Sequence, residues 1–249
     1  MTKDKKRRRR RRRGAVIYTP IALLLIVIIA IFGVSVFFRV ATIEVTGAEK
    51  YTVEQILSVS GIKTGDNLFI IDESKVARLI RSNLPYLSDV VIEKTMPDKI
   101  KIEVTESRPL AVVQYDGDWW VIDQSARVLE ETDNLGAGEK IKVNGLTIKA
   151  LGIGELIVIG EDDQTKFKYL TDVLYAIENA GIAEQVTVMD ISNIANITFD
   201  YTNRFTVTLG SGEDADNKIA RVLGIVETLV ESDMGRIDVS KEDEWRFIP

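Results

Sequence analysis

The spacing of apolar and polar residues separates a long N-terminal apolar stretch from a larger region of short alternating elements. From Gly14 to Phe38 there are 25 residues without a formally charged side chain, and Ile21–Phe32 is apolar throughout. At about 1.5 Å of rise per residue, a helix of this length crosses the roughly 30 Å hydrocarbon core of a bilayer. The pattern therefore predicts one N-terminal transmembrane helix at residues 15–38.

The next segment has the spacing of one strand and two helices. Val40–Val45 has the pattern of a strand, and Tyr51–Ser60 places apolar residues at helical spacing before Gly61. A second amphipathic stretch follows Asp72, a residue type that commonly caps helices, and stops before Pro85. Two helices after one strand are therefore expected.

Two further strands complete this segment. Residues 88–94 and 99–105 flank a turn, and in the second of them Ile100, Ile102 and Val104 point to one side. A strand of this kind has one buried face, which the two helices can cover. The pattern therefore predicts a compact unit of order β-α-α-β-β at residues 39–108.

The remainder is expected to be rich in short strands. Trp119 and Trp120 are neighbours on one such strand, so they should point to opposite faces. The expected fold class is α+β, with a β-rich domain at residues 109–240 that contains two helices and a short polar tail at 241–249. The predicted strands are 110–114, 119–122, 127–129, 186–191, 196–199, 204–209 and 236–240, and the predicted helices are 166–179 and 215–231.

The charge is distributed very unevenly. Residues 1–13 contain ten Lys and Arg and one Asp, which gives 10 − 1 = +9, whereas the whole chain carries −6. Because Lys and Arg beside an apolar span remain in the cytoplasm, residues 1–14 are expected to be a basic cytoplasmic tail and residues 39–249 to lie outside. A cleaved signal peptide would have a shorter apolar stretch. Nucleic-acid binding is disfavoured because the rest of the chain is acidic.

The residue types limit the chemistry of the chain. It has no Cys and no His, which excludes disulfides, thiol nucleophiles, and zinc sites or catalytic triads built on those side chains. The acidic pairs Asp162–Asp163 and Asp214/Asp216 could act in catalysis or calcium binding, but they lie in a polar turn and at a helix start, where acids are common. We therefore expect no enzyme activity, cofactor, metal site or small-molecule substrate.

Several short phrases, in a fixed order, carry a family resemblance. The chain resembles the bacterial cell-division protein family FtsQ/DivIB, whose first outer unit is a POTRA domain, except that its polar tail is shorter than in many DivIB proteins. The phrases are Gly65-Asp66-Asn67-Leu68-Phe69, Leu84-Pro85-Tyr86, Pro97-x-x-Ile100-x-Ile102-x-Val104-x-Glu106-x-x-Pro109, Trp120-Val121-Ile122-Asp123, Val207-Thr208-Leu209-Gly210, Lys218 and Ile237-Asp238-Val239.

The resemblance implies a non-catalytic scaffold at the division septum of the cell membrane. Such a protein would link partners of FtsL and FtsB/DivIC type and help to position septal peptidoglycan synthesis. The alternative is a POTRA-bearing membrane anchor that assists export or chaperones envelope proteins, although tandem POTRA units and a barrel pattern are not visible.

The candidate partner-binding segment is the last predicted strand. A terminal strand with a free edge can accept a partner strand through main-chain hydrogen bonds, and the polar run Lys241–Glu244 would discourage uncontrolled pairing. The candidate residues are Arg236, Ile237, Asp238, Val239 and Ser240.

Overall fold

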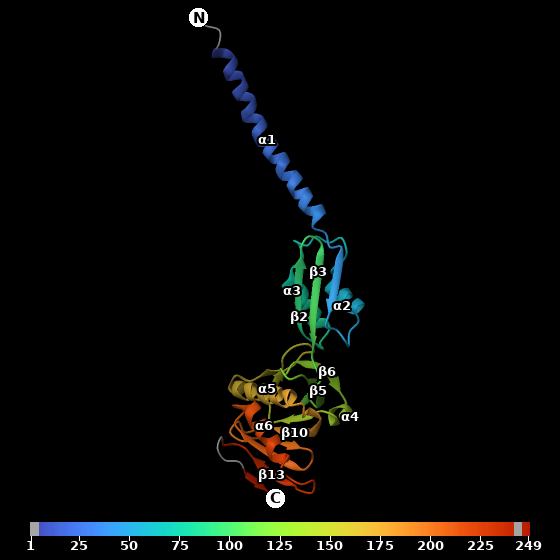
Figure 1. The fold of residues 1–249 in the computed structure, drawn as a ribbon, viewed down its shortest axis with the longest axis vertical. Helices are drawn as coiled ribbons and strands as arrows, with labels where there is room; N and C mark the ends of the chain where they lie inside the picture. The colour runs from blue at the N-terminus through green and yellow to red at the C-terminus, as the bar shows by residue number, and fades with distance from the viewer. Residues whose placement is uncertain (1–4, 242–245) are drawn as a thin grey trace. The chain divides into compact units, whose positions relative to one another are not determined.

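The computed structural model describes residues 5–241 and 246–249, which form two compact units. One unit extends to Leu79 and takes in Val90–Val104, and the other comprises Ile80–Asp89 and the chain from Thr105 onward. The strands assemble into sheets of three, nine and two strands (Figure 1). The architecture is thus a mixture of helices and sheets, α+β.

The N-terminal helix differs from the predicted one. Helix α1 runs from Lys5 to Phe37, so it begins within the basic run, and it contains Pro20. Within the described residues, no helix combines the length and the apolar character needed to cross a membrane. The prediction of a transmembrane helix at residues 15–38 is therefore wrong, because the basic and apolar stretches, expected as separate segments, belong to one helix of mixed character.

The first sheet has three strands and follows the predicted element order. β3 is its central strand, with β1 parallel to β3 on one side and β2 on the other (Figure 1). The elements are β1 (Thr42–Thr46), α2 (Val53–Ser60), α3 (Glu73–Asn83), β2 (Leu87–Thr95) and β3 (Lys99–Glu106).

Local hydrogen bonds and one glycine explain where both helices begin and where α2 ends. The Thr52 side chain accepts a bond from the Gln55 N–H at 3.3 Å, and the Gln55 side chain accepts one from the Thr52 N–H at 2.8 Å. This reciprocal capping box fixes the start of α2, and Gly61, with φ of 69°, ends it. Asp72 caps α3 as predicted, since its carboxylate accepts the Lys75 N–H at 3.0 Å.

The alternation predicted for β3 is confirmed. Ile100 and Ile102 are fully buried and Val104 is 6% exposed, whereas the residues between them are partly exposed. Replacing Ile102 with Ala should therefore lower the free energy of unfolding by about 2–4 kcal/mol, because it leaves a cavity. Lys101→Ala, on the other side of the strand, should have much less effect. Urea unfolding of a 39–249 fragment measures both, and equal losses would contradict this assignment of faces.

The nine-stranded sheet forms most of the second unit. Its spatial order is β14-β13-β12-β11-β10-β7-β4-β5-β6, so β14 and β6 are its two outer strands. The strands are β4 (Ala111–Tyr115), β5 (Asp118–Ile122), β6 (Val128–Thr132), β7 (Ile141–Asn144), β10 (Val186–Asp190), β11 (Ile197–Tyr201), β12 (Phe205–Gly210), β13 (Gly235–Asp238) and β14 (Arg246–Ile248), and the separate pair is β8 (Ile148–Ala150) with β9 (Val158–Ile159).

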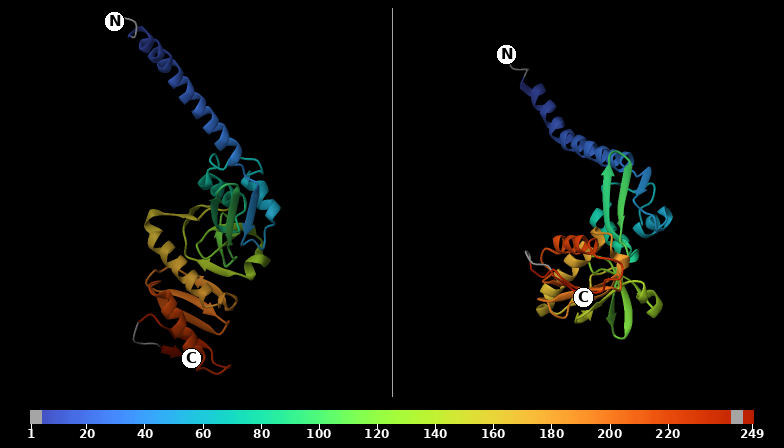
Figure 2. Two further views of the ribbon diagram at one scale, coloured as in Figure 1. Left: turned by 45° about the horizontal axis from the view of Figure 1, so that its top comes forward. Right: turned by 60° about the horizontal axis from the view of Figure 1, so that its bottom comes forward.

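Helices α5 (Gln164–Asn179) and α6 (Ala215–Val226) lie against the large sheet (Figure 2). Both were predicted, although α6 ends five residues earlier than expected, and a short third helix, α4 (Asn134–Gly138), was not. Residues of α5 and α6 share one buried cluster with side chains from eight strands of the sheet. Trp120 packs against this cluster, while the Trp119 indole N–H donates to the Asn134 side chain at 3.0 Å, so the two rings face opposite ways as predicted.

A buried carboxylate fixes the turn between β5 and β6. Asp123 is fully buried, and the Ser107 hydroxyl donates to its Oδ2 at 2.7 Å. Its Oδ1 accepts the main-chain N–H groups of Ser125 and Arg127, both at 2.9 Å. The carboxylate thus satisfies three donors, including the main chain of a turn in which Ala126 has φ of 61°.

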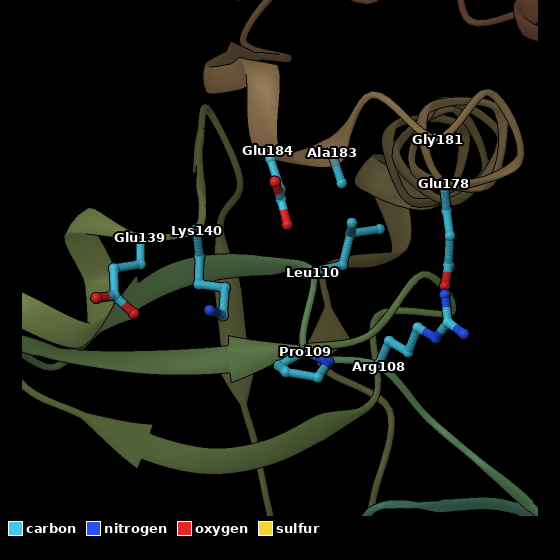
Figure 3. Close-up of a pocket in the computed structure, with 9 residues that line it drawn as sticks. All are labelled: Arg108, Pro109, Leu110, Glu139, Lys140, Glu178, Gly181, Ala183 and Glu184. Atoms are coloured by element: carbon cyan, nitrogen blue, oxygen red, sulfur yellow. The ribbon is translucent and has the colours of Figure 1, made fainter.

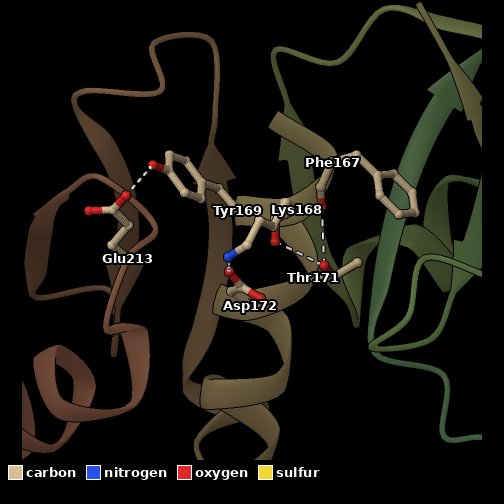
Figure 4. A network of polar contacts seen from close by, with 6 residues as sticks. All are labelled: Phe167, Lys168, Tyr169, Thr171, Asp172 and Glu213. Carbon is tan, nitrogen blue, oxygen red and sulfur yellow. Dashed lines mark hydrogen bonds and ion pairs between the residues drawn. The ribbon is translucent and has the colours of Figure 1, made fainter. Parts of the chain in front are cut away.

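A polar network joins the start of α5 to the loop that leads from β12 into α6 (Figure 4). The Tyr169 hydroxyl donates to the Glu213 carboxylate at 3.1 Å, and Lys168 pairs with Asp172 one turn along the helix. The loop can approach α5 closely only because residue 212 is glycine, since a Cβ there would collide with Tyr169. These contacts therefore fix how closely the loop before α6 approaches the start of α5.

Candidate partner-binding surface

The predicted partner-binding residues lie in and just after β13. This strand runs parallel to β12, with Val207 opposite Ile237 and Thr208 opposite Asp238. Ile237 and Val239 are fully buried, Arg236 and Ser240 are exposed, and Asp238 is partly exposed. The segment is therefore a half-buried strand whose apolar side chains join the core and whose polar side chains face solvent.

The N-terminal end of β13 is held by Arg204, the residue before β12. Its guanidinium donates to the main-chain carbonyls of Val230 at 2.6 Å and Asp233 at 3.0 Å. Its own carbonyl accepts the Gly235 N–H at 3.1 Å. One arginine therefore fixes the path by which the chain leaves α6 and enters β13.

The C-terminal end of the segment is held by residues around the end of β12. Gly210, with φ of 72°, leaves room for Ser240, since a Cβ at position 210 would lie 2.8 Å from the Ser240 Cβ. Lys218 is only 6% exposed, and its ammonium group donates to the Ser211 carbonyl at 2.8 Å. The Arg221 guanidinium donates to the Lys241 carbonyl at 2.9 Å. The main chain of residues 235–241 is thus anchored at both ends.

The outer side of β13 is not free in the structure, because β14 pairs with it. The two strands are antiparallel, with Arg236 opposite Ile248 and Asp238 opposite Arg246. The sequence predicted a polar tail here and an open edge on the last predicted strand. Residues 242–244 of that polar run lie outside the described part of the chain. Among the described strands, β14 is the outermost at this end of the sheet.

The described contacts of β14 combine ring packing with charge interactions. Phe247 meets the ring of Phe205 edge to face, with ring centroids 6.1 Å apart. Burial by itself would raise the pKa of the Asp238 carboxyl, but hydrogen bonds from Ser240 and the positive charges of Arg246 and Arg236 outweigh it and lower that pKa. Ile248 remains 49% exposed. The surface at this edge therefore combines an aromatic contact, opposite charges and an exposed aliphatic side chain.

A pocket of about 500 Å³ lies elsewhere in the same unit (Figure 3). Arg108 and Glu178 face each other in it, and Leu110 and Ala183 supply apolar walls. Burial raises the pKa of Glu178, Arg108 opposes that shift, and the charge of Asp123 adds to it. The lining mixes both signs of charge, a composition that selects no single class of ligand.

One member of each acidic pair considered in the sequence has a structural partner. Asp163 forms an ion pair with Lys166 at 3.3 Å, and Asp214 accepts the Asn217 side-chain amide at 2.6 Å beside the start of α6. The side chain of Asp162 lies outside what the structure describes. Among the described residues, no three acidic side chains are grouped as metal ligands would be.

The comparisons with known proteins agree in naming one family. A family model described as "POTRA domain, FtsQ-type" matches residues 38–107. The chain is 28% identical over 190 residues to the cell division protein DivIB of Clostridium tetani, an alignment that covers 76% of this chain and 70% of that protein. It is 26% identical over 208 residues to the cell division protein FtsQ of Streptomyces griseus, covering 83% of this chain and 95% of that protein.

The chain therefore contains a match to the FtsQ-type POTRA domain and is similar over most of its length to proteins named DivIB and FtsQ. A second DivIB, from Clostridium botulinum strain Hall, is 27% identical over 208 residues and covers 83% of this chain and 80% of that protein. The alignments of about 200 residues reach well beyond the POTRA domain, so the family likeness includes much of the β-rich unit. The resemblance drawn from the sequence phrases is confirmed, and the relatives that the chain matches are named cell division proteins.

Proposed function

We propose that the chain is a non-catalytic scaffold of the division machinery, which acts at the septum and helps to position peptidoglycan synthesis there. Its partners are division proteins of FtsL and FtsB/DivIC type. The names of the relatives support a role in cell division. The partner-binding residues are Arg236, Ile237, Asp238, Val239 and Ser240, together with the strand β14 beside them.

The observation that carries the proposal is the outer end of the nine-stranded sheet. Its last strands, β12, β13 and β14, present main-chain groups in an extended conformation that is anchored by Arg204 and Arg221. An ordered sheet edge binds an extended segment by adding it as a further strand, with main-chain hydrogen bonds giving affinity and alternate side chains giving specificity. Ordering the edge in advance lowers the entropic cost of binding.

Proline at position 238 is expected to disrupt binding through this edge. The Val239 N–H donates to the Thr208 carbonyl at 3.0 Å, so proline at 239 would damage the sheet itself. The main-chain N–H and C=O groups of Asp238 point away from β12. Proline at position 238 therefore removes a hydrogen-bond donor from the outer edge of β13. In a chain that ends at Lys241, so that only a partner can use this edge, Asp238→Pro should weaken binding at least about thirtyfold.

The matched control is Asp238→Ala in the same shortened chain, which changes the side chain and keeps the N–H. Calorimetric titration with the DivIC type protein of the same organism measures binding, and a thermal unfolding curve for each variant separates folding from binding. The proposal fails if the full chain, the shortened chain and both substitutions all bind with the same affinity. Loss of binding on shortening alone would place the partner on β14, at the same end of the sheet.

A further inference from the structure

We infer that β14 occupies, within the free protein, the place of the partner strand, and that a partner binds by replacing it. The inference rests on the proposed function and specifies how the same surface works. It also predicts the chemistry of the partner segment. That segment runs antiparallel to β13 and contains three consecutive residues, a basic, an aromatic and an aliphatic one. The aromatic residue lies opposite Ile237.

The direction of the main-chain groups is the first support. The N–H groups of Gly235 and Val239 point toward β12, with bonds to the Arg204 and Thr208 carbonyls at 3.1 and 3.0 Å. Successive residues of a strand point their N–H and C=O groups to opposite sides. The groups of Arg236 and Asp238 therefore point outward, where β14 pairs with them. The edge of β13 is thus a complete strand-binding site that is filled by the chain's own residues.

The small size of the β14 contact is the second support. The β13–β14 register contains three residue pairs, whereas the adjacent β12–β13 register contains four and the β11–β12 register contains five. Phe247 is only half-buried in its contact with Phe205, and Ile248 is 49% exposed. A strand held by so little surface can be displaced by a longer one that makes the same contacts and adds more.

Additional contacts are available beyond the end of β14. The Ile248 carbonyl lies against Gly235, so a longer strand in the place of β14 would continue past Met234. Met234 and Val230 are each 62% exposed. Apolar residues that follow the basic, aromatic and aliphatic triplet would cover these two side chains. The residues of β14, Arg246-Phe247-Ile248, are themselves a basic, an aromatic and an aliphatic residue paired with the edge of β13.

Replacement has a measurable consequence for affinity. When a site is open only part of the time, its apparent affinity is reduced by the open fraction.

A covalent link between β13 and β14 should close the site. The chain contains no cysteine, so Arg236→Cys combined with Ile248→Cys introduces the only two thiols. Opposed residues of an antiparallel pair, about 5.5 Å apart between Cα atoms, are within disulfide range.

The test compares the oxidised and reduced forms of this double variant in the full chain. The oxidised form should bind the DivIC type protein at least tenfold more weakly, and reduction should restore the affinity. Reduction serves as the control, because both forms carry the same substitutions. Equal binding by the two forms overturns the replacement model. Equal binding by the two forms is still compatible with the proposed function if Asp238→Pro weakens binding in the shortened chain.

Hydrogen exchange on the unsubstituted chain gives a second, independent result. On partner binding, the amides of Arg246 and Ile248 should lose protection while those of Arg236 and Asp238 keep it. Retained protection of residues 246–248 in the complex overturns the inference, and unchanged protection throughout 235–248 counts against the proposed function as well. The partner segment that gains protection must contain the basic, aromatic and aliphatic triplet. A protected segment without it contradicts the predicted chemistry.

Discussion

Replacing Phe199 with alanine should lower the free energy of unfolding by about 3–5 kcal/mol, a typical loss when a buried aromatic ring is removed. Phe199 is 1% exposed and lies on β11, between Met189 of β10 and Val207 of β12. It belongs to the cluster shared by the sheet with α5 and α6. Urea unfolding followed by circular dichroism measures the loss.

Two controls show whether volume or strand pairing causes the effect at Phe199. Phe199→Leu keeps most of the apolar volume and should cost much less than the alanine variant. Thr198→Ala changes the adjacent residue, which faces the other side of the sheet, and should have a small effect. A loss below about 1 kcal/mol for Phe199→Ala would mean that the ring is not enclosed in solution.

Replacing Asp123 with alanine should cost at least about 3 kcal/mol, because buried donors that lose their acceptor retain the full penalty of desolvation. The carboxylate accepts from the Ser107 hydroxyl and from the N–H groups of Ser125 and Arg127. Removing it leaves all three without that acceptor. Thermal and urea unfolding of the same variant provide the measurement.

Ser107→Ala is the matched comparison for Asp123→Ala. It removes one of the three donors and leaves the carboxylate bound to the turn, so a loss of about 1–2 kcal/mol is expected. Equal losses in the two variants would show that the carboxylate does not organise the turn. The hydroxyl bond alone would then account for the stability of this part of the chain.

The β-α-α-β-β order could be predicted because its signals are local. Thr52 and Gln55 form a capping box across three positions, Asp72 caps the next helix, and the alternation in β3 spans a whole strand. Each signal lies within one element and needs no distant partner. The same applies to α5, whose apolar spacing extends over 16 residues.

Elements defined by distant partners were missed. β7 (Ile141–Asn144) is four residues long and pairs in parallel with β4 and β10, neither of which is joined to it by a hairpin. α4 contains two glycines, which are typical of loops, and its start depends on the cap by Asp133. Short elements of this kind depend on tertiary pairing more than on their own propensity.

The candidate surface could be predicted only in part. Residues 236–240 were predicted to form a strand, and within them Ile237 and Val239 are buried. The neighbour on its outer side could not be predicted, because the three residues of β14 are too few to show a period. The anchoring by Arg204 and Arg221 also has no sequence signal, since each reaches a main-chain carbonyl at least 20 residues away.

The parallel pairing of β12 with β13 has a consequence for the order of folding. β11 and β12 are joined by a tight turn at Thr202–Asn203 and can pair as soon as both are synthesised. β13 reaches its place only after the intervening α6 has formed and docked, which makes its pairing a non-local and slower step. Until then the edge of β12 is an unpaired strand, the part of a nascent chain most prone to wrong pairing. The surface proposed to receive the partner is therefore completed late, and on that proposal a ribosome-bound chain cannot engage the partner before residues 235–238 have emerged.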